Sequence, residues 1–405
     1  MTAGALSMRR YRAQENSVTS SAFSPALATP ATPGIPAGDR PFEELARVHV
    51  APRAHPAHHS EGLDLVSWRR LSEAGLWRAG VPKQLGGHGG TWRHLALRLA
   101  DVARGGGDLG FVLSLVAHAN LVRALTEYGT PWQHERFLHP LLAGEVGASA
   151  MTEPQGQVKA VGTSARADGQ EPDGWSLTGV KEHVANAPVA DHALVLGHVV
   201  DLGERASTLF LVDLNAPGVS RGQREQPGGL RSSQAGALLL DSVPVPSTAV
   251  LGAPGDGLRT LHDIVGFGRA LYGLVATACL EPELRRILAN ARERRAVGSV
   301  MRDPRHVQGR LTDVRIIIET VRATALTGID ALVTGDSEAS LRCSIAGFIG
   351  SDGLVRAATH LMVLHQHLGG ARGAEARVVQ DALVAGATAD VQREDILDHM
   401  LAAQH

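Results

Sequence analysis

Three long helical patterns near the C-terminal end constrain the fold of this 405-residue chain most strongly. Apolar residues recur at helical spacing over residues 258–294, 305–334 and 339–368, and a shorter pattern covers residues 388–403. Each long segment is more than twice the average helix length, and such neighbours in sequence are typical of an antiparallel four-helix bundle. The sequence therefore predicts a C-terminal four-helix bundle over residues 254–405.

The period of the apolar residues changes upstream of this bundle. It is close to two along residues 175–177, 192–198, 209–214 and 237–240, which indicates strands separated by turns. We expect a β domain over residues 148–253. Residues 41–147 return to helical spacing and predict an N-terminal helical domain. Residues 1–40 are rich in Ser, Thr, Ala, Pro and Gly and predict a disordered tail, so the fold class is α+β.

Charge and hydropathy argue against two classes of partner. The formal net charge is −2, acids and bases are mixed along the chain, and no basic stripe suggests a nucleic-acid partner. Apolar stretches such as Ala235–Leu240 are shorter than a membrane span, so we expect no membrane segment.

The cysteines and histidines indicate neither a disulfide nor a metal centre. Cys279 and Cys343 stand alone in apolar surroundings, which predicts two buried free thiols and a cytoplasmic location. His55, His58 and His59 have a spacing that a metal could use, but no Cys or carboxylate set accompanies them, so we interpret the segment as a solvated linker.

A series of short motifs follows the same order as these domains. They are G-L-W-R-A-G-V-P-K-Q-L-G-G-H-G-G at 75–90, T-E-P at 152–154, G-V-K…N…A-D at 179–191, G-G-L-R-S-S at 228–233, D-S-V-P-V-P at 241–246, R-R-A-V-G at 294–298, L-T-D at 311–313, Q-H-L-G-G at 366–370 and Q-D-A at 380–382. No single motif is specific. Their order along most of the chain resembles that of the acyl-CoA dehydrogenase family. The resemblance implies a helical bundle, then a β domain, then a four-helix bundle.

The resemblance also implies that FAD is the cofactor, with its ring against the β domain. Thr152 matches a hydroxyl that hydrogen-bonds the flavin ring. Ala185 stands where a Ser or Thr usually bonds flavin N5, which leaves the main-chain N–H for that role. His183 stands where an aromatic side chain, often Trp, covers the ring.

The rest of the implied cofactor site is shared between subunits. Arg294 matches an arginine that pairs with the pyrophosphate held by the adjacent subunit, and a guanidinium suits phosphate oxygens. Arg305 either contacts phosphate or caps the next helix. Gln366, Gly369 and Gly370 match the segment that meets the adenosine diphosphate part. We therefore expect a homodimer or homotetramer.

The chain departs from the family at the catalytic base. The family places a glutamate either on the first bundle helix beside an arginine, or in a loop after the R-D-A motif. Arg269 matches that arginine on the substrate side, but its neighbour is Gly268, and Ala385 occupies the second place. The remaining candidates are the nearby acids Glu375, Asp381 and Asp390, of which we consider Glu375 first. Each of them is more simply an exposed or helix-capping acid.

These observations lead to one main hypothesis and two alternatives. The main hypothesis is a flavoprotein oxidoreductase that acts on an acyl thioester, carried by CoA or by an acyl-carrier protein, by analogy in secondary metabolism. The first alternative is a non-catalytic subunit paired with an active homologous subunit that supplies the base. The second is a family member with other chemistry, either a flavin monooxygenase or a cofactor-free protein.

Overall fold

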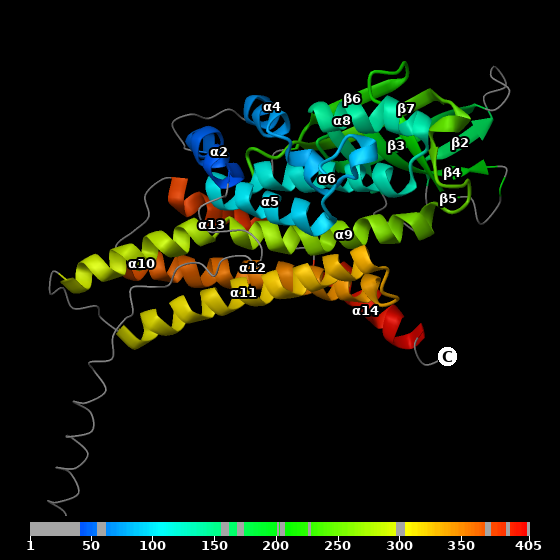
Figure 1. Ribbon diagram of the computed structural model, residues 1–405. Helices are drawn as coiled ribbons and strands as arrows, with labels where there is room; N and C mark the ends of the chain where they lie inside the picture. The colour runs from blue at the N-terminus through cyan, green and yellow to red at the C-terminus, as the bar shows by residue number, and fades with distance from the viewer. Residues whose placement is uncertain are drawn as a thin grey trace, which may run out of the picture. The chain divides into compact units, whose positions relative to one another are not determined.

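The N-terminal part of the structure consists of helices packed around one long central helix. The structure, a computed structural model, describes residues 41–54, 62–154, 162–167, 174–200, 202, 207–225, 228–296, 304–368, 374–385 and 389–402. The elements before the sheet are α2 (Pro41–His49), α3 (Ala51–Ala54), α4 (Leu65–Glu73), the 3-10 turns η2 (Leu76–Gly80) and η3 (Lys83–Leu85), α5 (Trp92–Gly106), α6 (Leu109–Tyr128), α7 (Pro131–Gln133), the π turn η4 (His134–Leu138) and α8 (His139–Ala143) (Figure 1). Asp108 begins α6 by accepting a hydrogen bond from the Phe111 N–H at 3.0 Å.

The sheet follows directly. Its strands are β1 (Gly147–Ala150), β2 (Ser164–Ala167), β3 (Trp175–Ala185), β4 (His192–Val199), β5 (Ser207–Asp213), β6 (Val219–Arg224), β7 (Ala235–Val245) and, after the 3-10 turn η6 (Ser247–Ala249), β8 (Val250–Leu251). They pair in the order β6-β7-β3-β2-β4-β5-β8, with β1 parallel to β4. The four strands predicted from alternating hydrophobicity are present, and the α+β class is confirmed.

The C-terminal helices differ from the sequence prediction in two respects. They are α9 (Gly257–Ala278), α10 (Glu281–Ala296), α11 (Pro304–Thr334), α12 (Ala339–Leu368), α13 (Ala374–Ala385) and α14 (Ala389–Ala402) (Figure 1). The predicted single helix over 258–294 is divided at residues 279–280, because Pro282 cannot donate a main-chain hydrogen bond to the preceding turn. The prediction also missed α13, a short helix between glycine-containing segments.

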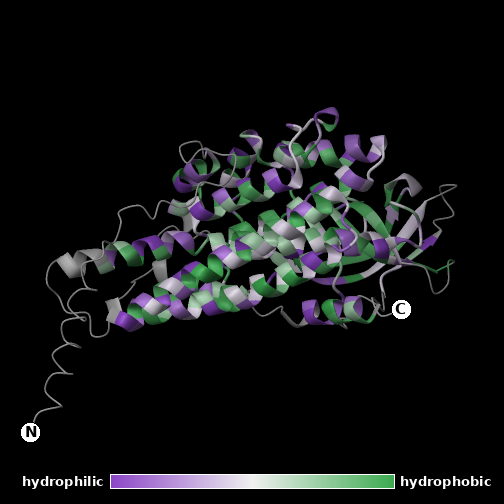
Figure 2. Cartoon of the chain, turned by 60° about the horizontal axis from the view of Figure 1, so that its bottom comes forward, coloured by the Kyte–Doolittle hydropathy of each residue, from purple (hydrophilic) through white to green (hydrophobic). Residues whose placement is uncertain are grey.

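Apolar residues are concentrated where the helices and the sheet pack together. In Figure 2 the strands carry long green stretches, whereas the outer helices alternate between purple and green. Residues 109–128 and 257–291 are long and apolar enough to cross a membrane, contrary to the sequence prediction, but 78% of each apolar window is buried within the protein. Such burial is typical of core helices in a folded domain. Cys279 and Cys343 are buried free thiols, as predicted.

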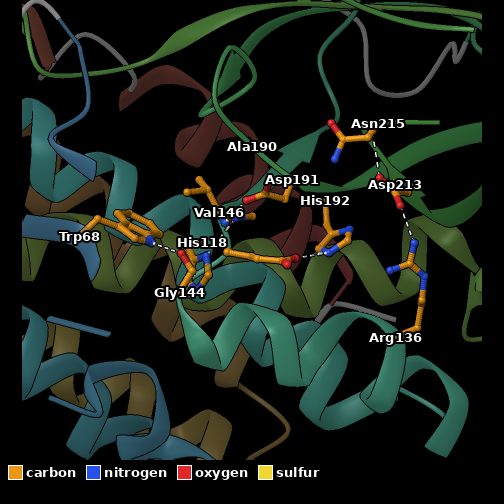
Figure 3. Close-up of polar contacts among 12 residues, drawn as sticks. Trp68, His118, Arg136, Gly144, Val146, Ala190, Asp191, His192, Asp213 and Asn215 are labelled. Carbon is orange, nitrogen blue, oxygen red and sulfur yellow. Dashed lines mark hydrogen bonds and ion pairs between the residues drawn. The ribbon is translucent and has the colours of Figure 1, made fainter. Parts of the chain in front are cut away.

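Polar side chains fix the connection between the N-terminal helices and the sheet (Figure 3). The Trp68 indole N–H donates to the Gly144 carbonyl at 3.0 Å, and Asp191 accepts the Val146 N–H at 2.8 Å. His118 on α6 accepts the Gly147 N–H through Nδ1 at 3.0 Å. Burial, with a smaller contribution from nearby His192, lowers the pKa of His118 to about 3, so this imidazole remains neutral.

Candidate functional site

The end of β3 has an irregular backbone beside the T-E-P segment. The pairing of β3 with β7 shifts register between Lys181 and Val184, and His183 and Asn186 have φ angles of 55° and 70°. Positive φ is uncommon for residues other than glycine and is often found at functional sites. The main-chain carbonyl of Thr152 accepts the Glu182 N–H at 3.0 Å. The structure therefore brings the half-buried Thr152 and Ala185 to the same strand end.

The side chain of His183 is exposed and already has a partner. Its Nδ1 lies 2.9 Å from Oε1 of Glu225, at the end of the neighbouring hairpin. This contact raises the pKa of His183. His183 thus lies at the bulge beside a carboxylate that favours its protonated form, and its role in covering a flavin ring stays a prediction.

A buried ion pair holds the T-E-P segment against β3. Lys181 Nζ donates to Glu153 Oε1 at 2.6 Å, and the two side chains are 0% and 4% exposed. The same carboxylate accepts hydrogen bonds from the main-chain N–H and the hydroxyl of Thr163 at 2.9 and 2.7 Å. Burial favours the neutral carboxyl, but the hydrogen bonds outweigh it and lower the pKa of Glu153 to about 2. Thr152 is therefore anchored through its neighbour in sequence.

Two carboxylates hold the 228–233 loop. Asp381 on α13 accepts the Leu230 N–H at 2.8 Å, and Asp108 accepts a hydrogen bond from the Ser232 hydroxyl. Burial raises the pKa of Asp381 to about 6. Asp381, expected from the sequence to be an exposed or helix-capping acid, is instead buried, and its contact with the loop gives it a structural role. A Cβ at Gly229 would lie 2.8 Å from Asp381 Oδ1, so a larger residue there would require the carboxylate to shift.

The first of the two base positions lies directly against an amide. Gly268 is buried on α9, and a Cβ built there would lie 2.4 Å from Nδ2 and 2.8 Å from Oδ1 of Asn120 on α6. Asn120 Oδ1 is buried without a hydrogen-bond partner in the described part of the chain. The Asn120 amide thus occupies the space that the first side-chain atoms of a glutamate at position 268 would need.

The second base position lies close to the same face of α9. Tyr272, one helical turn after Gly268, donates a hydrogen bond from its hydroxyl to the main-chain carbonyl of Ala385 at the end of α13. Arg269 forms an ion pair with Asp395 on α14, and its guanidinium also donates to the Ser344 hydroxyl at 3.2 Å. The structure thus ties position 385 to the α9 segment that carries position 268, and neither position has a carboxylate.

The remaining candidate residues are either exposed or outside the described atoms. Arg305, at the start of α11, and Gln366, near the end of α12, are exposed. The backbones of Arg294 and Glu375 lie in α10 and α13, but their side chains are outside the described atoms, as are Gly369 and Gly370. Asp390 is the second residue of α14, and its side chain is also not described. The role of each of these residues stays a prediction.

Asn120 and Tyr272 were not singled out from the sequence, and the contact between Glu153 and Lys181 was not predicted, although the two residues belong to the T-E-P and G-V-K motifs. A signal existed for Asn120, because it is a polar residue inside the otherwise apolar segment V-A-H-A-N-L-V. A second signal was Gly268, since an isolated glycine inside a helical pattern often marks a close approach of another element. Tyr272 had no comparable local signal, because its partner is a main-chain carbonyl far along the chain.

Three family models match the chain in order. They describe the N-terminal domain of acyl-CoA dehydrogenase over residues 40–145, the middle domain over 148–243 and the C-terminal domain over 255–401. Among curated proteins, the short-chain specific acyl-CoA dehydrogenase of Bos taurus mitochondria is 26% identical over 287 residues, which cover 70% of this chain and 68% of the relative.

Solved structures of similar fold have lower sequence identity. The prolyl acyl carrier protein oxidase AnaB has a TM-score of 0.74 at 22% identity, and covers 88% of this chain and 98% of its own. PigA, solved with FAD and proline, has a TM-score of 0.78 at 20% identity, and covers 90% of this chain and 98% of its own. At this level of identity the likeness shows the fold alone.

Proposed function

Because this chain belongs to the acyl-CoA dehydrogenase family, we propose that it is an FAD-dependent oxidoreductase that acts on an acyl thioester. The observation that carries the proposal is the match of all three family domains, in order, over nearly all of residues 40–401. The shared family supports an acyl thioester as the substrate class and an oligomer with a shared site. We further propose a cytoplasmic location, which the two buried free thiols support.

The residues at the end of β3 suit a flavin ring. Ser149 Oγ on β1, three residues before Thr152, is buried without a partner in the described ranges, so it has unused hydrogen-bonding capacity. In the proposal, Thr152 and the main chain at Ala185 contact the ring edge and His183 covers it. Arg294 of the adjacent subunit, Arg305, Gln366, Gly369 and Gly370 hold the phosphate and adenosine end. When bound, the flavin supplies the hydride acceptor for oxidation of the acyl group.

The missing carboxylate limits the reaction that we propose. An α,β-dehydrogenation needs a base for the α-proton, and Gly268 and Ala385 cannot accept one. The protein alone should therefore reduce its flavin slowly with simple straight-chain acyl-CoAs, unless Glu375 supplies the base. One structural neighbour, AnaB, is named as a prolyl acyl carrier protein oxidase, and this name supports an acyl group on a carrier protein and a role in secondary metabolism.

The first experiment is the visible spectrum of the purified protein. A stoichiometric flavin band is expected, and a colourless protein that does not take up added FAD would overturn the proposal in favour of a cofactor-free member. Arg294→Ala should weaken FAD retention by about 1.5–3 kcal/mol, the contribution of a charge-assisted hydrogen bond. Unchanged FAD affinity, or a strictly monomeric protein, would contradict the shared site.

The second experiment tests the reaction by anaerobic mixing with butyryl-CoA and octanoyl-CoA. Loss of general-base catalysis should slow flavin reduction by about 10²–10⁴-fold relative to a family member that retains the glutamate. Rapid bleaching would show that another residue is the base, and Glu375→Gln is then the first variant to compare. Bleaching only after addition of a homologous subunit would instead favour the non-catalytic subunit hypothesis, which the missing base motivates.

A further inference from the structure

Asn120 has an acceptor atom that the described part of the protein does not use. The residue lies in the second half of α6, is half-buried, and its Oδ1 is buried without a hydrogen-bond partner within the described residues. Buried amide oxygens in native proteins nearly always have a partner, which is another protein group, a water molecule or a ligand. A ligand that carries a hydrogen-bond donor could therefore bind at Asn120 Oδ1.

The surroundings of Asn120 suit an apolar ligand with a single polar group. Leu113, Val116, Ala117 and Asn120 recur at helical spacing on one face of α6, and Leu113 and Asn120 are partly accessible. Three of these side chains are apolar, and Asn120 is the polar member of the face. Small-molecule sites typically combine apolar walls with a few polar groups that orient the ligand.

Gly268 makes this arrangement possible. Any side chain at position 268 would start 2.4 Å from Asn120 Nδ2, so the amide can hold its place only opposite glycine. The family resemblance implies a carboxylate at one of two places, and at the first of them, position 268, an amide from another helix occupies the space. An amide can accept a hydrogen bond but is a poor proton acceptor, so binding is the role that suits Asn120.

We propose that Asn120 Oδ1 accepts a hydrogen bond from an O–H or N–H group on the acyl part of the substrate. The protein would then select hydroxyacyl or aminoacyl thioesters over plain hydrocarbon acyl thioesters. A hydrocarbon chain at this place would exclude water and leave Oδ1 unpaired, whereas a donor on the acyl group would satisfy it. This inference rests on the proposed function, because it assumes that the acyl group lies beside Gly268.

The test compares three thioesters of matched chain length on the FAD-containing full-length protein. Butyryl-, 3-hydroxybutyryl- and 3-aminobutyryl-pantetheine present the arm that CoA and acyl-carrier proteins have in common. Isothermal titration calorimetry gives the three Kd values. The hydroxyacyl or the aminoacyl thioester should have a Kd at least about tenfold lower than that of butyryl-pantetheine. Whichever of the two binds more tightly shows whether the donor is an O–H or an N–H group.

The variants test whether Asn120 causes the preference. Asn120→Ala should reduce the difference between the thioesters to about twofold or less, because no acceptor remains. Asn120→Leu is close to asparagine in size and provides the same comparison if the alanine variant does not fold. Thr126→Ala is the control on the same helix, because its hydroxyl donates only to the α6 backbone, at 2.8 Å from the Val122 carbonyl, and it should retain the wild-type preference.

The outcomes distinguish failure of the Asn120 proposal from failure of the proposed function. Equal affinity of the wild-type protein for the three thioesters would overturn the role of Asn120 and leave the proposed function standing. A preference that survives in every folded Asn120 variant would overturn it as well. If none of the three thioesters binds, the proposed function fails, and the inference that depends on it fails too.

Discussion

The hydroxyl of Tyr272 on α9 donates a hydrogen bond to the main-chain carbonyl of Ala385, 113 residues further along the chain. Gly268 lies one turn before Tyr272, so α9 connects the two positions at which the family resemblance implies a base. The contact also fixes the last residue of α13 against α9. The two base positions are therefore parts of one region of the fold and not independent features.

We predict that Tyr272→Phe releases the end of α13 from α9. The variant keeps the ring and loses the hydroxyl, so a carbonyl that accepted a hydrogen bond must find another donor. The free energy of unfolding should fall by about 1 kcal/mol, and amide hydrogen exchange should become faster in peptides from α13. Exchange in peptides from α11 serves as the internal control. Unchanged exchange in α13 would show that the contact does not hold the helix.

Much of the fold could be predicted from the sequence because it depends on local periodicity. Strand β7 alternates between buried and exposed side chains, whereas β4 and β5 are short apolar runs that are buried almost throughout. The lengths of α11 and α12 were correctly anticipated. The break before α10 was missed because the pattern of apolar residues continues across it, although Pro282 should have indicated it.

The candidate site could be predicted only in part. Gly268 and Ala385 were recognised as unusual because each differs from a family motif. The side chains beside them could not be deduced, because Asn120 comes from a different helix and its approach to Gly268 depends on how α6 and α9 pack. Periodicity predicts which face of a helix is buried, but it does not predict which residue it meets.

The buried pair behind the T-E-P segment should be essential for stability. Lys181→Met leaves the Glu153 carboxylate buried without its cation, and breaking such a pair typically costs about 3–5 kcal/mol. Urea unfolding measures the loss. Adding Glu153→Gln removes the uncompensated charge and retains an acceptor for the Thr163 hydroxyl, so the double variant should recover part of the stability. A double variant with a lower free energy of unfolding than Lys181→Met would contradict this explanation.

Stability should depend on pH through His118. Its pKa is about 3 in the folded protein and 6.5 in the reference state, so folding favours the neutral imidazole. This contribution is fully present above pH 6.5 and is lost as the pH falls toward 3. Between pH 7 and pH 5 the group should account for about 2 kcal/mol of lost stability, measured by urea unfolding at each pH.

Two substitutions separate the titration of His118 from its hydrogen bond. Neither His118→Phe nor His118→Gln can be protonated in this range, so both should remove that part of the pH dependence. They should differ in stability at pH 7, because Phe leaves the buried Gly147 N–H without its acceptor, at about 1–3 kcal/mol, whereas Gln offers a carbonyl. If the free energy of unfolding depended on pH in both variants as it does in the wild type, another group would be responsible for the titration.

The last prediction restores a carboxylate at position 268. Gly268→Glu alone should lower stability by about 1–3 kcal/mol, because the new Cβ lies 2.4 Å from Asn120 Nδ2 and the amide must move. Asn120→Ala removes that obstacle, so the double variant Asn120→Ala/Gly268→Glu should lose less unfolding free energy than the two single variants lose in total. A double-mutant cycle in urea measures this coupling.

Anaerobic flavin reduction by butyryl-CoA in this double variant should be faster than in the wild type by about 10²-fold, the lower end of the contribution of a general base. The matched control is Asn120→Ala/Gly268→Gln, which has the same size and cannot accept the proton. Equal rates in the Glu and Gln variants would mean that position 268 does not face the reacting carbon, and that the base must be sought near Glu375 or on a partner subunit.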